Sequence, residues 1–212
     1  MQFSYVIIIP MILIHSVNNT FNGIIHKQHL RPDNIETREA YSFLNTDVPF
    51  DDIVKSYEEI TICGDTLISI HSDQIGLPYS TYIQLKDRLY IQLKDGSYKR
   101  IRQQLGIGEI DKLYTSQKRS NQLGMETAEY KATSKNGDTD YILQVTPMLN
   151  FKHQAKNKYL FANVFSEEGI ILYINKKYLP SNMDFISIVD QIEFKKLTCK
   201  EKIEELNFIE PD

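Results

Sequence analysis

Alternation of apolar and polar residues is the clearest pattern in the chain, and it is strongest on either side of Asn136-Gly137. Asn-Gly between two alternating runs is a strong short signature of a β-hairpin. Read as a two-residue loop, it pairs Ala132 with Tyr141, Tyr130 with Leu143, and Ala128 with Val145 on one face. The other face then pairs Thr133 with Asp140, Lys131 with Ile142, and Glu129 with Gln144. One face is apolar and the other largely polar, which predicts a half-buried hairpin.

A second hairpin is predicted from a short repeat, because YIQLKD occurs at residues 82–87 and again at 90–95. Matching apolar faces would place Leu85 beside Ile91 and Ile83 beside Leu93, which requires an odd-length loop centred on Arg88. The next turn, at Asp95-Gly96, would then bring Tyr98 beside Leu93. The segment therefore reads as a three-strand meander.

The C-terminal third predicts a mixture of strands and helices. Residues 159–165 and 170–173 read as a strand pair, and the first carries apolar residues on both faces, so something must cover its second face. The helical candidates are 37–44, 50–57, 183–189 and 199–206, the last two opened by Ser181 with Asp184 and Thr198 with Glu201 at capping-box spacing. Residues 192–197 alternate like a strand. We therefore expect an α+β fold, mainly antiparallel sheet built of hairpins and a meander, with a few short helices packed on one face.

The first residues form an apolar run, from Phe3 to Ile14, that is too short to span a bilayer as a helix. Its length suits a secretory signal or anchor ending near Ser16, although no basic residue precedes it. A buried first strand fits the same residues. Residues 1–16 are thus a signal segment or a strand, and residues 17–212 form a single domain. Secreted or periplasmic placement is favoured over cytoplasmic placement.

The distribution of charge along the chain indicates which class of partner the protein binds. The formal net charge is −4 over 212 residues, so the chain as a whole has no polyanion-binding excess. Basic residues gather between Lys94 and Arg119, and we take four residues of this stretch as the predicted binding surface: Lys99, Arg100, Arg102 and Tyr114. Tyr98, the best stacking aromatic there, belongs to the inner face of the meander. A protein partner is therefore expected rather than nucleic acid.

Reactive residues are few. Cys63 and Cys199 are the two cysteines, and neither has a second Cys or His at zinc-ligand spacing. They are either two buried thiols or one bridge closing a long loop. His26, His29, Asp33 and His71 are the best candidates for a catalytic site, but the His26–His29 spacing fails the zinc-protease signature. No metal or other cofactor is predicted.

Three functions remain open. The leading one is a non-enzymatic binding module, exported or not, that holds a protein partner on a sheet face, an edge strand or a charged surface. The second is a hydrolase whose site is assembled from His26, His29, Asp33 and His71, and it requires at least two of these side chains to meet in one pocket. The third is a structural component of an exported assembly, which would need a self-complementary apolar patch.

Overall fold

The computed structural model describes residues 21–31, 55–101, 110–147, 162–164, 166, 169–197, 199, 203 and 206–209, without the side chains of 110–118. These residues form one twelve-stranded sheet in the order β12-β6-β5-β4-β3-β2-β1-β11-β10-β9-β8-β7. The strands are β1 (Asn22–Leu30), β2 (Lys55–Cys63), β3 (Thr66–Ser72), β4 (Pro78–Leu85), β5 (Arg88–Gln92), β6 (Tyr98–Ile101), β7 (Ile110–Gln122), β8 (Met125–Ser134), β9 (Thr139–Thr146), β10 (Ile170–Tyr178), β11 (Met183–Phe194) and β12 (Phe208–Ile209).

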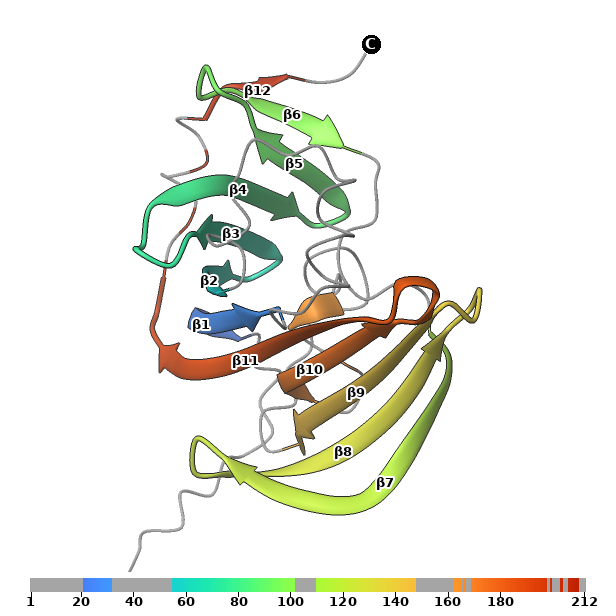
Figure 1. Cartoon of the computed structure of the whole chain (residues 1–212). Coiled ribbons are helices and arrows are strands. Elements are labelled where there is room, and N and C mark those ends of the chain that lie inside the picture. The colour runs from blue at the N-terminus through green and yellow to red at the C-terminus, as the bar shows by residue number, and fades with distance from the viewer. Residues whose placement is uncertain are drawn as a thin grey trace, which may run out of the picture.

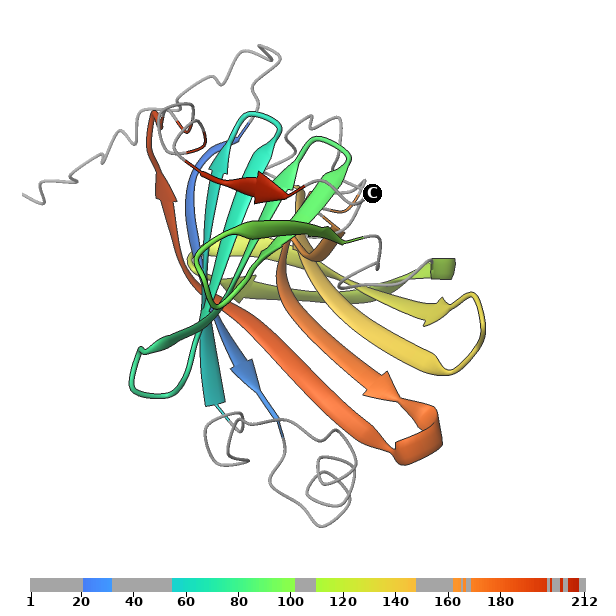
Figure 2. The ribbon, with the colours of Figure 1, turned by 90° about the horizontal axis from the view of Figure 1, so that it is seen from above.

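Two meanders make up this sheet. Strands β1 to β6 pair in chain order, strands β7 to β11 pair in chain order, and β1 joins β11 antiparallel. Only β12, which runs parallel to β6, departs from antiparallel pairing. The sheet bends strongly at the β1–β11 seam, so that the two meanders face each other across a concave side (Figures 1 and 2).

The α+β prediction is wrong, because the sheet dominates and the described residues hold only short helical turns. Residues 183–189, predicted as a helix, lie in β11, between β10 and β1. Their apolar spacing fits either period, and hydrogen bonding to a strand on each side decides for the β-strand. Ser181 lies in a 3-10 turn, η3 (Leu179–Ser181), so the capping box with Asp184 does not form. The predicted helix at 50–57 is also wrong over its described part, because β2 begins at Lys55.

Two other predicted elements are described in part. Residues 162–164, expected within a strand, form a short 3-10 turn that buries Val164 completely. In the predicted helix at 199–206, the Ile203 N–H donates to the Cys199 carbonyl and the Leu206 N–H to the Ile203 carbonyl, both at 3.1 Å, so its described residues make helical hydrogen bonds. Residues 1–16, the predicted helix at 37–44 and Thr198 lie outside the described residues.

The Asn136-Gly137 hairpin is confirmed in register. Strands β8 and β9 pair Ala132 with Tyr141 and Tyr130 with Leu143, and the other four predicted pairs are also present. The loop is longer than predicted, since β8 ends at Ser134 and β9 begins at Thr139. A side chain stabilises it, as the Thr139 N–H donates to Ser134 Oγ at 3.0 Å. Gly137 has a φ of 75°, which favours glycine.

The register predicted for β4 and β5 is wrong, although the three-strand meander of β4, β5 and β6 is present. Leu85 pairs with Arg88 and Ile83 with Tyr90, around a two-residue Lys86-Asp87 turn. Tyr98 pairs with Gln92 instead of Leu93. The prediction assumed one buried face. Both faces are covered here: Leu89 enters the main core, while Ile83 and Tyr90 pack under Phe208 and Leu206 on the opposite face.

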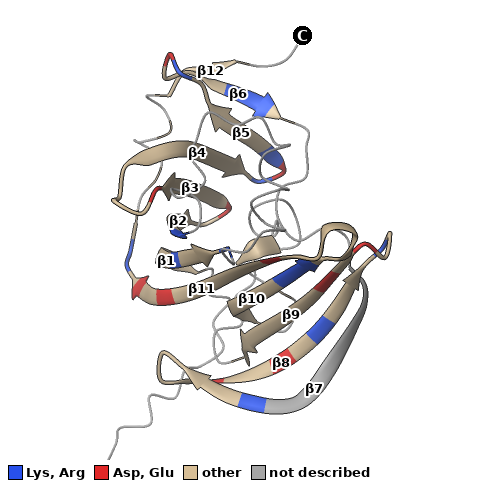
Figure 3. Cartoon of the chain, viewed as in Figure 1, with Lys and Arg blue, Asp and Glu red and all other residues tan. Residues whose placement is uncertain are grey.

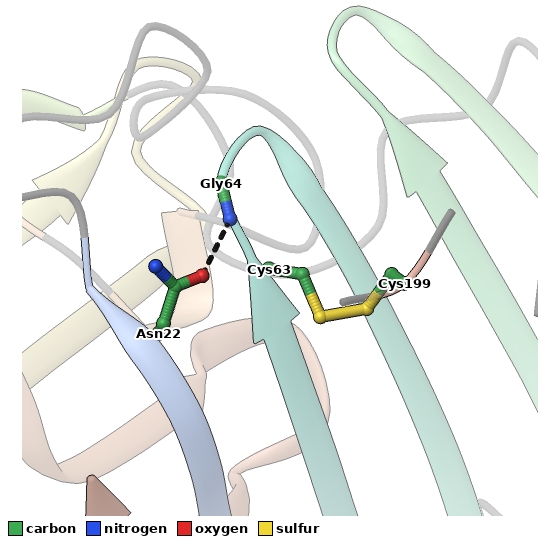
Figure 4. The surroundings of a disulfide bond; sticks show 4 residues. All are labelled: Asn22, Cys63, Gly64 and Cys199. Atoms are coloured by element: carbon green, nitrogen blue, oxygen red, sulfur yellow. Dashed lines mark hydrogen bonds between the residues drawn. A yellow bond between two sulfur atoms is a disulfide. The ribbon is translucent and has the colours of Figure 1, made fainter. Parts of the chain in front are cut away.

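A disulfide holds the C-terminal segment against the sheet. Cys63, at the end of β2, is bonded to Cys199 with a Cα–Cα distance of 5.9 Å (Figure 4). Beside it, the Gly64 N–H donates to Asn22 Oδ1 at 2.9 Å, which ties the β2–β3 turn to the start of β1. The bridge, left open by the sequence, is therefore formed.

Candidate functional site

Cross-strand pairing places polar side chains in a row on the face that also carries the main core. Lys27 on β1 lies opposite Glu58 on β2, and Glu58 lies opposite His71 on β3. These positions have the inward parity of Ile25, Ile60 and Leu67, which are buried core residues. The row is therefore turned toward the concave side by the same alternation that builds the core.

Glu58 is the centre of the cluster. Its side chain is only 6% exposed, and its Oε2 lies 3.0 Å from His29 Nε2. Its Oε1 accepts a hydrogen bond from Ser69 Oγ at 2.5 Å and lies 3.6 Å from His71 Nε2. Both carboxylate oxygens thus have polar neighbours, as a buried carboxylate requires.

The two imidazoles come from different strands and are held by further contacts. His29 Nδ1 lies 2.6 Å from Ser187 Oγ on β11. The rings of His29 and His71 are stacked with centroids 5.7 Å apart, and the Tyr82 ring meets His71 edge-on at 5.6 Å. The histidines are therefore oriented by neighbours on other strands, which limits their freedom to turn away from Glu58.

Lys27 adds a buried cation. It is 2% exposed, and its Nζ donates to the Asn163 carbonyl at 2.6 Å. Burial lowers the pKa of Lys27, and the charge of Glu58 opposes that shift. Burial alone would raise the pKa of Glu58, but His71, His29 and Lys27 together hold it well below its usual range. Burial also lowers the pKa of His71 against the opposing pull of Glu58. Glu58 is therefore ionised at neutral pH.

A cavity of about 390 Å³ opens over this cluster. Basic side chains on its wall are Lys27, Arg31 and Lys176, and the carboxylate is that of Glu58. Apolar wall residues are Leu30, Ile174, Phe185 and Ile186. Arg31 lies over the Phe185 ring at 4.7 Å, and Tyr79, which is 44% exposed, also lines the cavity. The cavity spans the β1–β11 seam and so takes its wall from both meanders.

Of the histidines predicted for a hydrolase site, the structure brings two together and leaves one apart. His29 and His71 meet at Glu58 in one cavity. His26 has the opposite parity on β1, and its Nε2 lies 3.4 Å from Glu193 Oε1. Asp33 lies outside the described residues.

Lys99 and Arg100 are the two residues of the predicted binding surface whose side chains are described. Lys99 and Arg100 lie on β6, next to β12 at one end of the strand order, where Figure 3 shows them as a basic segment. Tyr114 lies on β7 at the other end, and nothing is described of its side chain. Arg102 lies outside the described residues.

Sequence reasoning missed Glu58, Ser69, Ser187 and Lys27. A signal existed for the first two, because both continue the inward parity of buried residues on their strands: Glu58 with Ile60 and Ile62, Ser69 with Leu67. A polar residue at an inward position of a strand needs a partner, and that need points to a site. No comparable local signal marks Ser187, which reaches His29 across 158 positions of sequence.

No protein-family model and no curated protein matches the sequence. Among solved structures, an uncharacterized conserved protein from Thermus thermophilus is similar, with a TM-score of 0.51 and 6% identity over 90% of this chain and 91% of that chain. The fold is what the two share. A structure of PNGF-II is similar with a TM-score of 0.48 and 11% identity, over 91% of this chain and 32% of that chain. A putative outer membrane lipoprotein-sorting protein domain from Vibrio parahaemolyticus is similar with a TM-score of 0.40 and 8% identity, over 87% of this chain and 90% of that chain. The last two likenesses carry no weight for function.

Within the described ranges, no helix has the length and hydrophobicity needed to cross a membrane.

Proposed function

We propose that this protein is a non-enzymatic binding module that holds a small anionic ligand with an apolar portion in the cavity at the β1–β11 seam. The observation that carries this proposal is the make-up of the wall, where three basic side chains face one carboxylate beside four apolar side chains. Ligand sites are typically cavities of roughly 300–1,000 Å³ with apolar walls and a few placed polar groups. The cavity of about 390 Å³ falls in that range.

The basic residues divide into two groups. Lys27 is engaged by Asn163 and balanced by Glu58, so it serves the cluster at the floor. Lys176 is half-buried on β10, and burial lowers its pKa, with Asp138 opposing the shift. A partly desolvated ammonium gains from an anion that replaces lost water. We therefore expect the charged group of the ligand to meet Lys176 and Arg31, with its apolar portion against Ile174 and Phe185.

The disulfide supports export to an oxidising compartment, because disulfides persist there and are rare in the reducing cytosol. Secreted or periplasmic placement thus stays our proposal for localisation. Quenching native cells with acid and then alkylating the denatured protein with a thiol-reactive polymer tests it. We expect no mass shift at Cys63 and Cys199 until the protein is reduced, whereas ready labelling of both would contradict export.

A fluorescent anion tests the ligand proposal. 1-Anilinonaphthalene-8-sulfonate should bind with one equivalent. Decanoate should displace it with an affinity roughly 10- to 100-fold higher than that of decanol, since a charge-assisted hydrogen bond is worth about 1.5–3 kcal/mol. Decyltrimethylammonium, of opposite charge, should compete most weakly. These titrations are run in EDTA so that no metal contributes.

Matched variants locate the binding. Lys176→Met removes one of the two cationic partners from the cavity wall, and it should reduce the preference for decanoate over decanol, with Arg31 still present. Lys94→Met removes a charge from the exposed β5–β6 turn and should leave both affinities unchanged. Equal affinity for decanoate and decanol in the wild type, or an unchanged preference in Lys176→Met, would refute the proposal. A protein partner and a structural assembly role, both predicted from the sequence, stay predictions.

A second candidate is a serine hydrolase, favoured by one specific arrangement. Ser187 Oγ lies 2.6 Å from His29 Nδ1, and His29 Nε2 lies 3.0 Å from Glu58 Oε2. The hydroxyl contacts a base and the base contacts a carboxylate, which is the arrangement that activates a serine nucleophile. Labelling of Ser187 by a fluorophosphonate, lost in Ser187→Ala, would support the hydrolase. Absence of labelling in the wild type would favour the binding module.

A further inference from the structure

We propose that His29, Glu58 and His71 form a binding site for a divalent transition-metal ion of the Zn²⁺ type. The site goes beyond the proposed ligand binding and does not depend on it. One ligand atom from each of these residues lies within 4.8 Å of the other two. Two imidazole nitrogens with one carboxylate oxygen suit Zn²⁺ and its neighbours in the transition series, whereas Ca²⁺ and Mg²⁺ prefer oxygen ligands alone.

The spacing suits a single ion. Glu58 lies between the two rings, with Oε2 at 3.0 Å from His29 Nε2 and Oε1 at 3.6 Å from His71 Nε2. Ligand atoms bound to zinc at about 2.0–2.1 Å in a tetrahedron lie roughly 3.4 Å from one another. The two distances to Glu58 bracket this value, so the carboxylate needs little rearrangement to share an ion with either imidazole. The three residues lie on three adjacent strands in fixed register, which holds the donors in place.

Neighbouring groups would orient the ligands as metal sites require. A metal-binding imidazole usually donates its second N–H to a hydrogen-bond acceptor, which fixes the tautomer. Ser187 Oγ, 2.6 Å from His29 Nδ1, can accept that proton and leave Nε2 free for the ion. Ser69 Oγ donates to Glu58 Oε1 at 2.5 Å and would orient the carboxylate. This tautomer of His29 is the opposite of the one that a serine hydrolase needs, because a base must accept the serine proton at Nδ1.

Charged side chains around the cluster affect metal binding in both directions: the carboxylate attracts the ion and the basic residues repel it. Among the described residues that line the cavity, Glu58 supplies the negative charge. Lys27, buried beside it, repels a dication and weakens binding. Arg31 and Lys176 line the same cavity and repel it as well. Removing the charge of Lys27 should therefore tighten metal binding, whereas removing any one ligand should abolish it.

The experiment uses the full chain, treated with EDTA and dialysed, in two titrations. Calorimetry with Zn²⁺ should show one equivalent bound. Co²⁺ should produce the visible absorption of a four- or five-coordinate ion, which a loosely held hexahydrate lacks. The cysteines form a disulfide, so thiolates do not compete. Failure of the wild type to bind either ion with one equivalent would overturn the proposal, and ligand binding measured in EDTA would be unaffected by that failure.

Variants assign the site. His71→Asn and Glu58→Gln should each lose the one-equivalent binding and the Co²⁺ absorption. Ser187→Ala should weaken Zn²⁺ binding roughly 10- to 100-fold through loss of the His29 hydrogen bond. His26→Gln is the matched control, because His26 is also a β1 histidine beside a carboxylate, with Glu193 at 3.4 Å, and it should bind as the wild type does.

Lys27→Met keeps the ligands and removes the repelling charge, and its affinity for Zn²⁺ should rise. This variant remains informative if the ligand variants fail to fold. Binding that survives in His71→Asn, is lost in His26→Gln, or does not tighten in Lys27→Met would contradict the assigned site.

Discussion

The residue that organises the site is Glu58, a carboxylate buried among core side chains. Burial disfavours its charge, and two histidines, a lysine and a serine hydroxyl restore what water would otherwise supply. A buried charge is tolerated only when it is paired and hydrogen-bonded. The members of the cluster therefore stabilise one another, and removing one of them should destabilise the arrangement of the others.

Ser69→Ala tests this dependence. Ser69 is fully buried, and its hydroxyl donates to Glu58 Oε1 and lies 3.1 Å from His71 Nε2. Removing a hydrogen bond to a charged group costs about 2 kcal/mol. Urea unfolding followed by far-UV circular dichroism should show a lower midpoint with an unchanged slope. An unchanged midpoint would mean that Glu58 does not need this donor.

The two hairpins differ in whether the alternation of apolar and polar residues predicts the register of their strands. Strands β8 and β9 keep the predicted register because the predicted pairs match apolar with apolar residues on one face and leave the other largely polar. Strands β4 and β5 have buried residues at adjacent positions, Ile83 with Gln84 and Leu89 with Tyr90. Matching one apolar face therefore predicted the wrong register, because the C-terminal segment covers the other face.

Phe208→Ala tests that cover. The Phe208 ring lies 4.7 Å from Tyr90 and 5.6 Å from Tyr98, centroid to centroid. Because Phe208 is only partly buried, truncation should cost about 2 kcal/mol, below the roughly 3–5 kcal/mol of a fully buried Phe. Ile209→Ala is the matched control in the same two-residue strand: Ile209 is 42% exposed, and its loss should change thermal stability little. Equal effects of the two variants would mean that Phe208 does not anchor the segment.

At the scale of the whole molecule, the site exists because two meanders meet. His29, Glu58 and His71 come from the first meander, while Ser187, Lys176 and Phe185 come from the second. The antiparallel β1–β11 pairing sets His29 opposite Ser187. Neither meander alone would close the cavity wall.

The disulfide links the end of β2 covalently to the C-terminal segment. Cys63 and Cys199 are 136 positions apart, so the bridge closes a long loop and should stabilise the fold by about 4–5 kcal/mol on the chain-entropy model. Urea unfolding with and without reductant should show that difference. The double variant Cys63→Ser with Cys199→Ser should match the reduced wild type. A wild type equally stable in both conditions would contradict a stabilising role for the bridge.

From the amino-acid sequence alone, the β8–β9 hairpin follows: its alternation of period two, its turn at Asn136-Gly137 and its residue pairs. These are local, because a turn fixes the register of the strands that it joins. Three features depend on contacts between distant segments: the strand at residues 183–189, the cover on both faces of β4 and β5, and the contact of Ser187 with His29. Such contacts join segments far apart in the chain. The local pattern of apolar and polar residues near either partner therefore does not predict them.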